Sequence, residues 1–136
     1  MTLKSTDNFK IDVINRQTID NDTDTICENS RGSLREGDGK FYLMYRTESQ
    51  TVMIKITEGR INVKRTGEYC SDMEYIKGKH TAFPYKTPYG IIDMEIITHD
   101  IRYRLDSNGG EIQLVYDIIT GGDKMSNKME IRITKI

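Results

Sequence analysis

Apolar and polar residues alternate along most of the chain, and this alternation is the clearest pattern in the sequence. The period is two residues in the segments 52–57, 61–64, 101–106, 112–118 and 128–134. A two-residue period places apolar side chains on one face of a β-strand and polar side chains on the other. No segment shows the spacing of an amphipathic helix. The pattern therefore predicts an all-β protein built from half-buried strands.

Residues that favour tight turns separate the predicted strands at short intervals. They are Gly37-Asp38-Gly39, Glu58-Gly59, Thr66-Gly67, Lys77-Gly78, Asn108-Gly109-Gly110 and Gly121-Gly122-Asp123. Such residues tolerate the positive φ angles of hairpin turns, and their spacing predicts about ten strands joined as consecutive hairpins. Because a sheet of that length must protect its edges, we expect a single antiparallel up-and-down β-barrel. A two-sheet sandwich is the alternative that periodicity leaves open.

Both prolines of the chain lie in the stretch KGKHTAFPYKTPYG, residues 77–90. Pro84 has no N–H to donate to a neighbouring strand, so it is expected at a sheet edge or a bulge. The segment 87–90 fits a β-turn with proline at the second position and glycine at the fourth. We therefore predict a strand, a bulge and a turn here. One face of that strand carries Thr81, Phe83 and Tyr85.

Composition is that of one globular domain spanning residues 1–136. The 20 Lys+Arg and 21 Asp+Glu residues leave a net charge of -1, so no strong field attracts nucleic acid or an anionic membrane. No apolar run approaches the ~20 residues of a membrane span, and the N-terminus lacks the apolar segment of a signal peptide. We expect a cytoplasmic protein with no membrane partner. Cys27 and Cys70 are then expected to be small buried thiols rather than a disulfide.

No combination of residues indicates catalysis, a metal site or a cofactor. Residues 20–24 have the Asp-x-Asp-x-Asp spacing of a calcium loop, but Thr25 and Arg31 stand where glycine and glutamate are needed. The cysteines and histidines lack the short spacings of a zinc site. A nucleophile needs an adjacent base, and no such arrangement is indicated by His80 or His99. We therefore expect a protein that is not an enzyme and holds no metal or cofactor.

Three segments, VKRTGEYCSDMEYIKGKH, YKTPYG and LDSNGGEIQLVY, carry a resemblance to a known family. Its motifs correspond here to Arg65 and Gly67, Met73 and Tyr75, Gly78 to His80, Tyr85 with Thr87 to Gly90, and Gly109-Gly110. In this combination the chain resembles the YwiB-like family of bacterial proteins from about residue 40 onward. The resemblance implies a lipocalin-like, calycin-type β-barrel and no established activity. The family's Gly- and Thr-rich excursion after a Tyr-x-Glu-Ser step is missing at residues 45–50.

The first function hypothesis is a barrel that binds a small anionic or amphipathic molecule in its interior. Arg65 continues the apolar stripe of Ile61 and Val63, so it points inward or to the rim, where it could pair with a carboxylate or phosphate. The alternative is that Arg65 forms a structural pair with an acid such as Glu68, or reaches water at the strand end. The other candidate ligand-binding residues are Met73, Phe83, Tyr85, Tyr103 and Tyr116.

The second hypothesis is an interaction module that binds protein or single-stranded nucleic acid on its outer surface. A basic group with an aromatic residue, the composition of a stacking platform, consists of Lys77, Lys79, His80, Lys86 and Tyr89. The near-neutral net charge makes nucleic acid the less favoured partner. The sequence specifies neither a ligand nor an oligomeric state.

Overall fold

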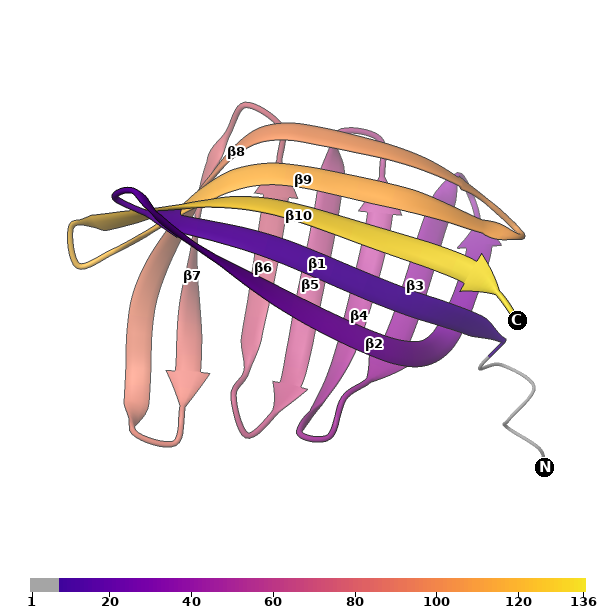
Figure 1. The fold of residues 1–136 in the computed structure, drawn as a ribbon, viewed down its shortest axis with the longest axis horizontal. Coiled ribbons are helices and arrows are strands. Elements are labelled where there is room, and N and C mark those ends of the chain that lie inside the picture. Colours follow the sequence, from indigo (N-terminus) through magenta and orange to yellow (C-terminus); the bar gives the residue numbers. More distant parts are fainter. Residues whose placement is uncertain (1–7) are drawn as a thin grey trace.

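A computed structural model describes residues 8–136, which form ten β-strands (Figure 1). The strands are β1 (Phe9–Ile19), β2 (Asp22–Gly37), β3 (Lys40–Arg46), β4 (Gln50–Thr57), β5 (Arg60–Gly67), β6 (Ser71–Ile76), β7 (His80–Thr87), β8 (Gly90–Asp106), β9 (Gly109–Thr120) and β10 (Asp123–Lys135). They form one antiparallel sheet in the order β6-β5-β4-β3-β2-β1-β10-β9-β8-β7. The predicted all-β, up-and-down arrangement is confirmed. Within residues 8–136 no helix is long and apolar enough to cross a membrane.

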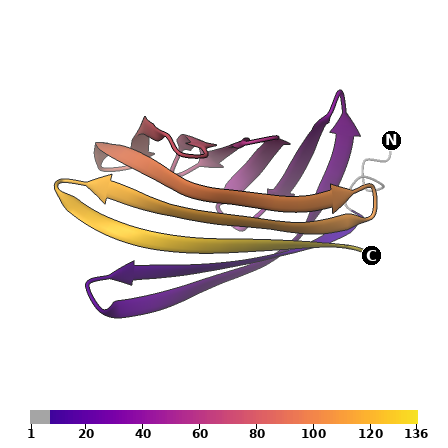
Figure 2. The same ribbon diagram turned by 90° about the horizontal axis from the view of Figure 1, so that it is seen from above.

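The sheet curls around one core into a nearly closed barrel. In Figure 1, β8, β9, β10, β1 and β2 cross in front of β3 to β7, and Figure 2 shows the two layers from above. The two layers are parts of one hydrogen-bonded sheet, so the sandwich alternative is wrong. β8 passes through a register shift between Thr98 and Asp100. Such a bulge bends a strand and helps the sheet to turn.

The alternation predicted from the sequence separates an apolar interior from a polar exterior. Ile54 and Ile56 on β4 and Ile61 and Val63 on β5 are buried, whereas the residues between them point outward. Burial of such side chains contributes about 1.5–3 kcal/mol each. Side chains from both layers therefore fill the interior of the barrel.

The wall of the barrel is incomplete where β6 and β7 meet. One isolated backbone bridge lies here, with Cys70 N donating to Lys86 O and Lys86 N donating to Cys70 O, both at 2.9 Å. The Thr81 hydroxyl adds a side-chain hydrogen bond from β7 to Glu74 O of β6 at 2.7 Å. Alternate residues of a strand direct their backbone groups to the same side, so the next rung would need an N–H from Pro84. Proline has none, and the ladder stops. We call this unpaired junction the seam.

The structure confirms the predicted turn and places Pro84 on an edge strand. Thr87 pairs with Gly90 across Pro88 and Tyr89, and the Thr87 hydroxyl donates to Gly90 O at 2.8 Å. β7 pairs with β8 in unbroken register, so the predicted bulge at Pro84 is wrong. An edge strand accommodates a residue without an N–H, because no neighbouring strand needs a hydrogen bond on that side, and so no bulge is required.

Replacing Gly90 with valine should lower the free energy of unfolding by about 1–3 kcal/mol. Gly90 has φ of +133°, a conformation that a β-branched residue adopts only under strain, although an added Cβ would touch nothing within 4 Å. Urea unfolding measures the effect. Gly37→Val is the matched control, because its Cβ also meets nothing within 4 Å and its φ is not positive. Equal losses in the two variants would contradict backbone strain as the cause.

The cysteines form no disulfide, but the prediction that both are buried is wrong. Cys27 is exposed and Cys70 is partly exposed. Cys27 occupies a position on the outer face of β2, opposite Ile14 of β1. Cys70 lies between β5 and β6, outside the alternation that buries strand residues.

Candidate functional site

Several apolar stripes on the inner face of the barrel end in a polar residue. Asn15 follows Val13 on β1, Tyr45 follows Leu43 on β3, and Arg65 follows Val63 on β5. Tyr45 and Arg65 both lie opposite Val52, on either side of it in the sheet. Tyr116 of β9 pairs with Asn127 of β10. Hydroxyl, amide and guanidinium groups thus interrupt the apolar inner surface.

Two buried tyrosines form the centre of this polar region. The rings of Tyr75 and Tyr116 meet edge to face, with centroids 4.8 Å apart, and the Tyr75 hydroxyl donates to Met73 Sδ at 3.8 Å. Asn15 Nδ2 donates to Asn127 Oδ1 at 3.3 Å. Burial, as the largest cause, raises the pKa of Tyr75 and that of Tyr116 above the ordinary range. Both phenols therefore remain neutral hydrogen-bonding groups at physiological pH.

The Arg65 guanidinium acts on the tyrosines of this region. Burial is the largest cause that raises the pKa of Tyr45 to about 12; the Arg65 guanidinium opposes this rise and the Glu28 carboxylate contributes to it. The same positive charge acts on Tyr75 and Tyr116. Within residues 8–136 no carboxylate oxygen lies within 4.0 Å of the Arg65 guanidinium. The structure therefore does not contain the predicted close ion pair with Glu68, whereas Arg65 is partly exposed near the end of β5.

A hollow of about 250 Å³ opens beside Arg65 at the seam. The outward-facing residues that line it include Lys64, Lys86 and one acid, Asp72, which accepts a hydrogen bond from Asn62 Nδ2 at 2.7 Å. Arg65 borders it from the inner face. The remaining lining residues are Thr66, Cys70, Ser71 and Pro84. The hollow thus combines an excess of positive charge with small polar groups.

Ser71 supplies an unpaired polar atom on the inner side of the seam. Its residue is 7% exposed, and its hydroxyl has no hydrogen-bond partner. A buried hydroxyl without a partner costs about 1–3 kcal/mol. Ser71 lies directly opposite Arg65 across β5 and β6, so the unpaired hydroxyl and the guanidinium lie on the same, inner face of the sheet.

The structure brings some of the predicted site residues together and separates others. Arg65, Met73 and Tyr116 meet around Tyr75. Phe83 is buried on the inner face of β7. The remaining two predicted residues lie elsewhere and are described next.

Tyr85 and Tyr103 lie in different parts of the barrel. Tyr85 is half-buried and stacks on Tyr69, with ring centroids 5.9 Å apart, on the segments that flank the seam. Tyr103 lies opposite Ile112, four residues along β9 from Tyr116. At about 3.3 Å per residue this separates Tyr103 from the tyrosine pair by roughly 13 Å.

Sequence reasoning missed the polar residues that surround Arg65. Asn15, Tyr45 and Asn127 stand at inward positions of otherwise apolar stripes, and that position is the signal that could have identified them. Ser71 carried no such signal, because its role depends on the unpaired seam. A polar residue on an apolar stripe indicates a functional or structural polar cluster.

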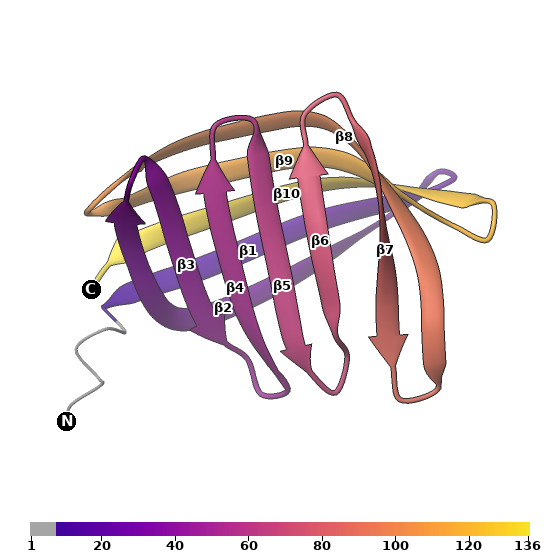
Figure 3. The same ribbon diagram turned by 180° about the vertical axis from the view of Figure 1, so that it is seen from behind.

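The basic group proposed for nucleic acid or protein does not form one surface. Lys77, Lys79 and His80 lie at one end of β7, and Lys86 and Tyr89 lie at the other, about 20 Å away at ~3.3 Å per residue (Figure 3). Lys77 pairs with an acid at 3.2 Å and His80 with another at 3.1 Å. This separation and pairing weaken the case for a stacking platform.

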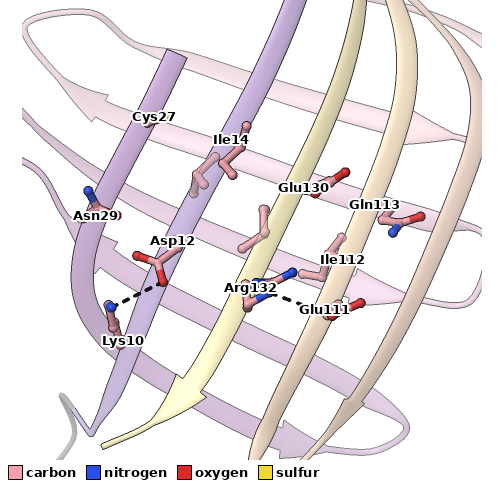
Figure 4. Close-up of a pocket in the computed structure, with 12 residues that line it drawn as sticks. Lys10, Asp12, Ile14, Cys27, Asn29, Glu111, Ile112, Gln113, Glu130 and Arg132 are labelled. Carbon is pink, nitrogen blue, oxygen red and sulfur yellow. Dashed lines mark ion pairs between the residues drawn. The ribbon is translucent and has the colours of Figure 1, made fainter. Parts of the chain in front are cut away.

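A second hollow, of about 420 Å³, lies on the outer face of β1, β2, β9 and β10 (Figure 4). Its charged groups pair with one another, as shown by Lys10 with Asp12 at 3.8 Å and Arg132 with Glu111 at 3.9 Å. Within residues 8–136 no three His, Cys, Asp or Glu side chains are arranged to hold a metal ion. The third acid of the lining, Glu130, pairs with Arg16 outside the hollow at 3.7 Å, so each charged side chain of the lining has a partner of opposite charge.

Known proteins share both the sequence pattern and the fold. A family described as domain of unknown function (DUF1934) matches residues 11–133. The uncharacterized beta-barrel protein YwiB of Bacillus subtilis (strain 168) is 28% identical over 89 residues, 62% of this chain but 63% of that protein, less than two thirds of its length. The crystal structure of ywiB protein from Bacillus subtilis matches 99% of both chains with a TM-score of 0.88 at 22% identity, which shows the barrel fold alone. The resemblance noted in the sequence is confirmed, and the chain belongs to the DUF1934 family.

Proposed function

We propose that the protein is a binding protein, not an enzyme, and that it takes up a small molecule carrying a carboxylate or phosphate at the seam. One observation carries the proposal: the half-buried Arg65 guanidinium has no carboxylate within 4.0 Å among residues 8–136. The Tyr45 hydroxyl interacts with this guanidinium but carries no charge to balance it. A partly desolvated cation without a carboxylate partner is costly, and an anionic ligand would offset that cost.

The surroundings of Arg65 support an anion rather than a neutral ligand. Guanidinium groups bind carboxylate and phosphate through two parallel hydrogen bonds. The unpaired Ser71 hydroxyl lies opposite Arg65 on the inner face and supplies a further hydrogen-bond donor. Lys64 and Lys86 add positive charge on the outer side of the seam. The guanidinium and the hydroxyl can therefore act on one anion, whereas the two lysines raise the positive potential at the seam from the outer face.

The position of the site also limits the size of the ligand. The centre of the barrel is filled by side chains such as Ile54, Ile61 and Leu114. We therefore expect the ligand at the seam and not deep in the interior. The stacked rings of Tyr69 and Tyr85 flank the seam and provide an apolar wall for an amphipathic molecule.

Replacing Arg65 with methionine should weaken anion binding by about 1.5–3 kcal/mol, the usual range for a hydrogen bond to a charged group. Methionine retains an apolar stem of similar length and removes the guanidinium. Isothermal titration calorimetry with inorganic phosphate and with octanoate measures the effect. Folding should change little or improve, because the variant no longer holds a half-buried cation.

Arg46→Met is the matched control, because Arg46 directly follows Tyr45 on β3 but its side chain is exposed. It loses the same charge as Arg65→Met and should bind the anion as the unmodified protein does. Unchanged affinity in Arg65→Met together with a marked loss of stability would make Arg65 a structural residue. Absence of binding by either anion to the unmodified protein would also contradict the proposal.

A further inference from the structure

We infer that the ligand of the seam is an amphipathic anion whose apolar tail crosses the inner side of the seam, from Arg65 and Ser71 over Tyr85 to Ile92. This inference rests on the proposed function, because its anionic head group is the one that Arg65 would hold. It adds the class of ligand, the path of the tail and the residues that would select the length of the tail.

Strand pairing places four inward-facing residues in one row across four strands. Arg65 on β5 lies opposite Ser71 on β6, and Tyr85 on β7 lies opposite Ile92 on β8. The isolated backbone bridge of the seam makes Ser71 and Tyr85 neighbours as well, because each adjoins one of the two bridged residues on antiparallel strands. Directly opposed residues of antiparallel strands point to the same side of a sheet, so all four side chains share the inner face. We call these four residues the inner row.

The inner row is polar at one end and apolar at the other. The Arg65 guanidinium is half-buried, and the Ser71 hydroxyl, in a residue that is 7% exposed, has no hydrogen-bond partner. The Tyr85 ring is half-buried and stacks on Tyr69, whereas Ile92 is 43% exposed although it faces inward. An unpaired donor beside a cation is suited to an anionic head group, and an exposed apolar side chain on an inner face is suited to an apolar tail.

The side of the inner row toward the barrel centre is closed by packed side chains. Phe83 and Met94 form the next inward-facing pair of β7 and β8, and Phe83 is 5% exposed. On the other side the Tyr69 ring lies against Tyr85, with centroids 5.9 Å apart. A tail can therefore lie along the row at the rim of the barrel and does not need to enter the filled interior.

The span of the inner row sets the length of the tail. Three steps between neighbouring strands cover about 14 Å at ~4.8 Å per step, close to an extended chain of roughly ten carbon atoms. The two bridge bonds of 2.9 Å keep β6 and β7 at ordinary strand spacing at this point. β9 pairs with β8 only from Glu95 onward, so no further strand adjoins Ile92. Affinity should therefore rise with chain length up to about ten carbons and then level off.

Isothermal titration calorimetry with butanoate, decanoate and dodecanoate tests the length of the tail. On a half-open surface each added CH₂ group should tighten binding about twofold, roughly half of the free-energy gain of full burial. Decanoate should therefore bind at least about tenfold more tightly than butanoate, and dodecanoate should bind within about twofold of decanoate.

Ile92→Thr tests the path of the tail and keeps a β-branched side chain on the strand. It should weaken decanoate binding about threefold or more and leave butanoate and inorganic phosphate binding unchanged. Ile91→Thr is the matched control, because Ile91 is the adjacent residue, is 66% exposed and points to the opposite face of β8. It should leave the affinity of all three anions unchanged. If Ile92→Thr fails to fold, the chain-length series on the unmodified protein decides.

Decanoate binding no tighter than butanoate binding, or equal losses in Ile92→Thr and Ile91→Thr, would overturn the inference. Its failure is separable from that of the proposed function. If Arg65→Met abolishes phosphate binding while chain length has no effect, only the tail path is wrong. If affinity rises with chain length while Arg65→Met binds decanoate as the unmodified protein does, only the anion site is wrong.

Discussion

Raising the pH from about 8 to about 12 should unfold the protein cooperatively, because three buried phenols keep their protons in the native state. Burial raises the pKa of Tyr45 to about 12 and moves the pKa values of Tyr75 and Tyr116 in the same direction. In the unfolded chain the phenols ionise near pH ~10. Above that pH the unfolded state binds fewer protons than the native state, so the free energy of unfolding falls as pH rises.

The sign and size of the effect follow from linkage. The contribution is fully present below about pH 10 and is lost as the pH rises through the native-state pKa values, at about 1.4 kcal/mol per pH unit for each phenol. For Tyr45 alone, whose pKa is raised from 10.0 to about 12, this amounts to about 3 kcal/mol. Urea unfolding at a series of pH values gives the slope. Phenolate absorbance should rise together with unfolding.

Tyr45→Phe tests the assignment, with Tyr42→Phe as the matched control. Tyr42 lies on the same strand but on its exposed face. The alkaline slope should become shallower in Tyr45→Phe and should remain unchanged in Tyr42→Phe. The same slope in Tyr45→Phe as in the unmodified protein would show that the buried phenols do not control alkaline stability.

Replacing Gly110 with alanine should cost about 4 kcal/mol or more of unfolding free energy. An alanine Cβ there would collide with the carbonyl oxygen of Arg104, and the φ of +143° is unfavourable for any side chain. Neighbouring backbone cannot move away easily, because β8 and β9 pair along their length. Thermal or urea unfolding measures the loss.

Gly121→Ala separates the collision from the strain of a positive φ. Gly121 also has a positive φ, of +58°, but an added Cβ would meet no atom within 4 Å. We expect a loss of only about 1 kcal/mol there, typical of alanine at a left-handed position. Similar losses at Gly110 and Gly121 would contradict the close approach of the Arg104 carbonyl.

The strands were predictable because the alternation of apolar and polar residues within each segment indicates which side chains are buried. Ile61 and Val63 on β5 and Leu114 and Tyr116 on β9 face the core, as the two-residue pattern predicts. The β-turn at Thr87 was also predictable, because the requirements of that turn are local. The barrel was predictable because closing a long sheet protects its edges.

The seam was not predictable, because it depends on strands that are not neighbours in the sheet order. Nothing local indicates that Cys70 meets Lys86, or that the missing N–H of Pro84 stops the ladder between β6 and β7. Burial of the Ser71 hydroxyl and exposure of Cys70 follow from that meeting. Arg65, in contrast, was identified as a candidate because it extends an apolar stripe of its own strand.

The central claim is that Arg65 holds an anionic small molecule, and native mass spectrometry of protein purified from its own host tests it most directly. Unmodified protein should carry an added mass from a small carboxylate or phosphate compound, and Arg65→Met prepared in the same way should lack it. Arg46→Met should retain it. A free-chain mass for the unmodified protein, or an added mass that survives in Arg65→Met, would contradict the claim.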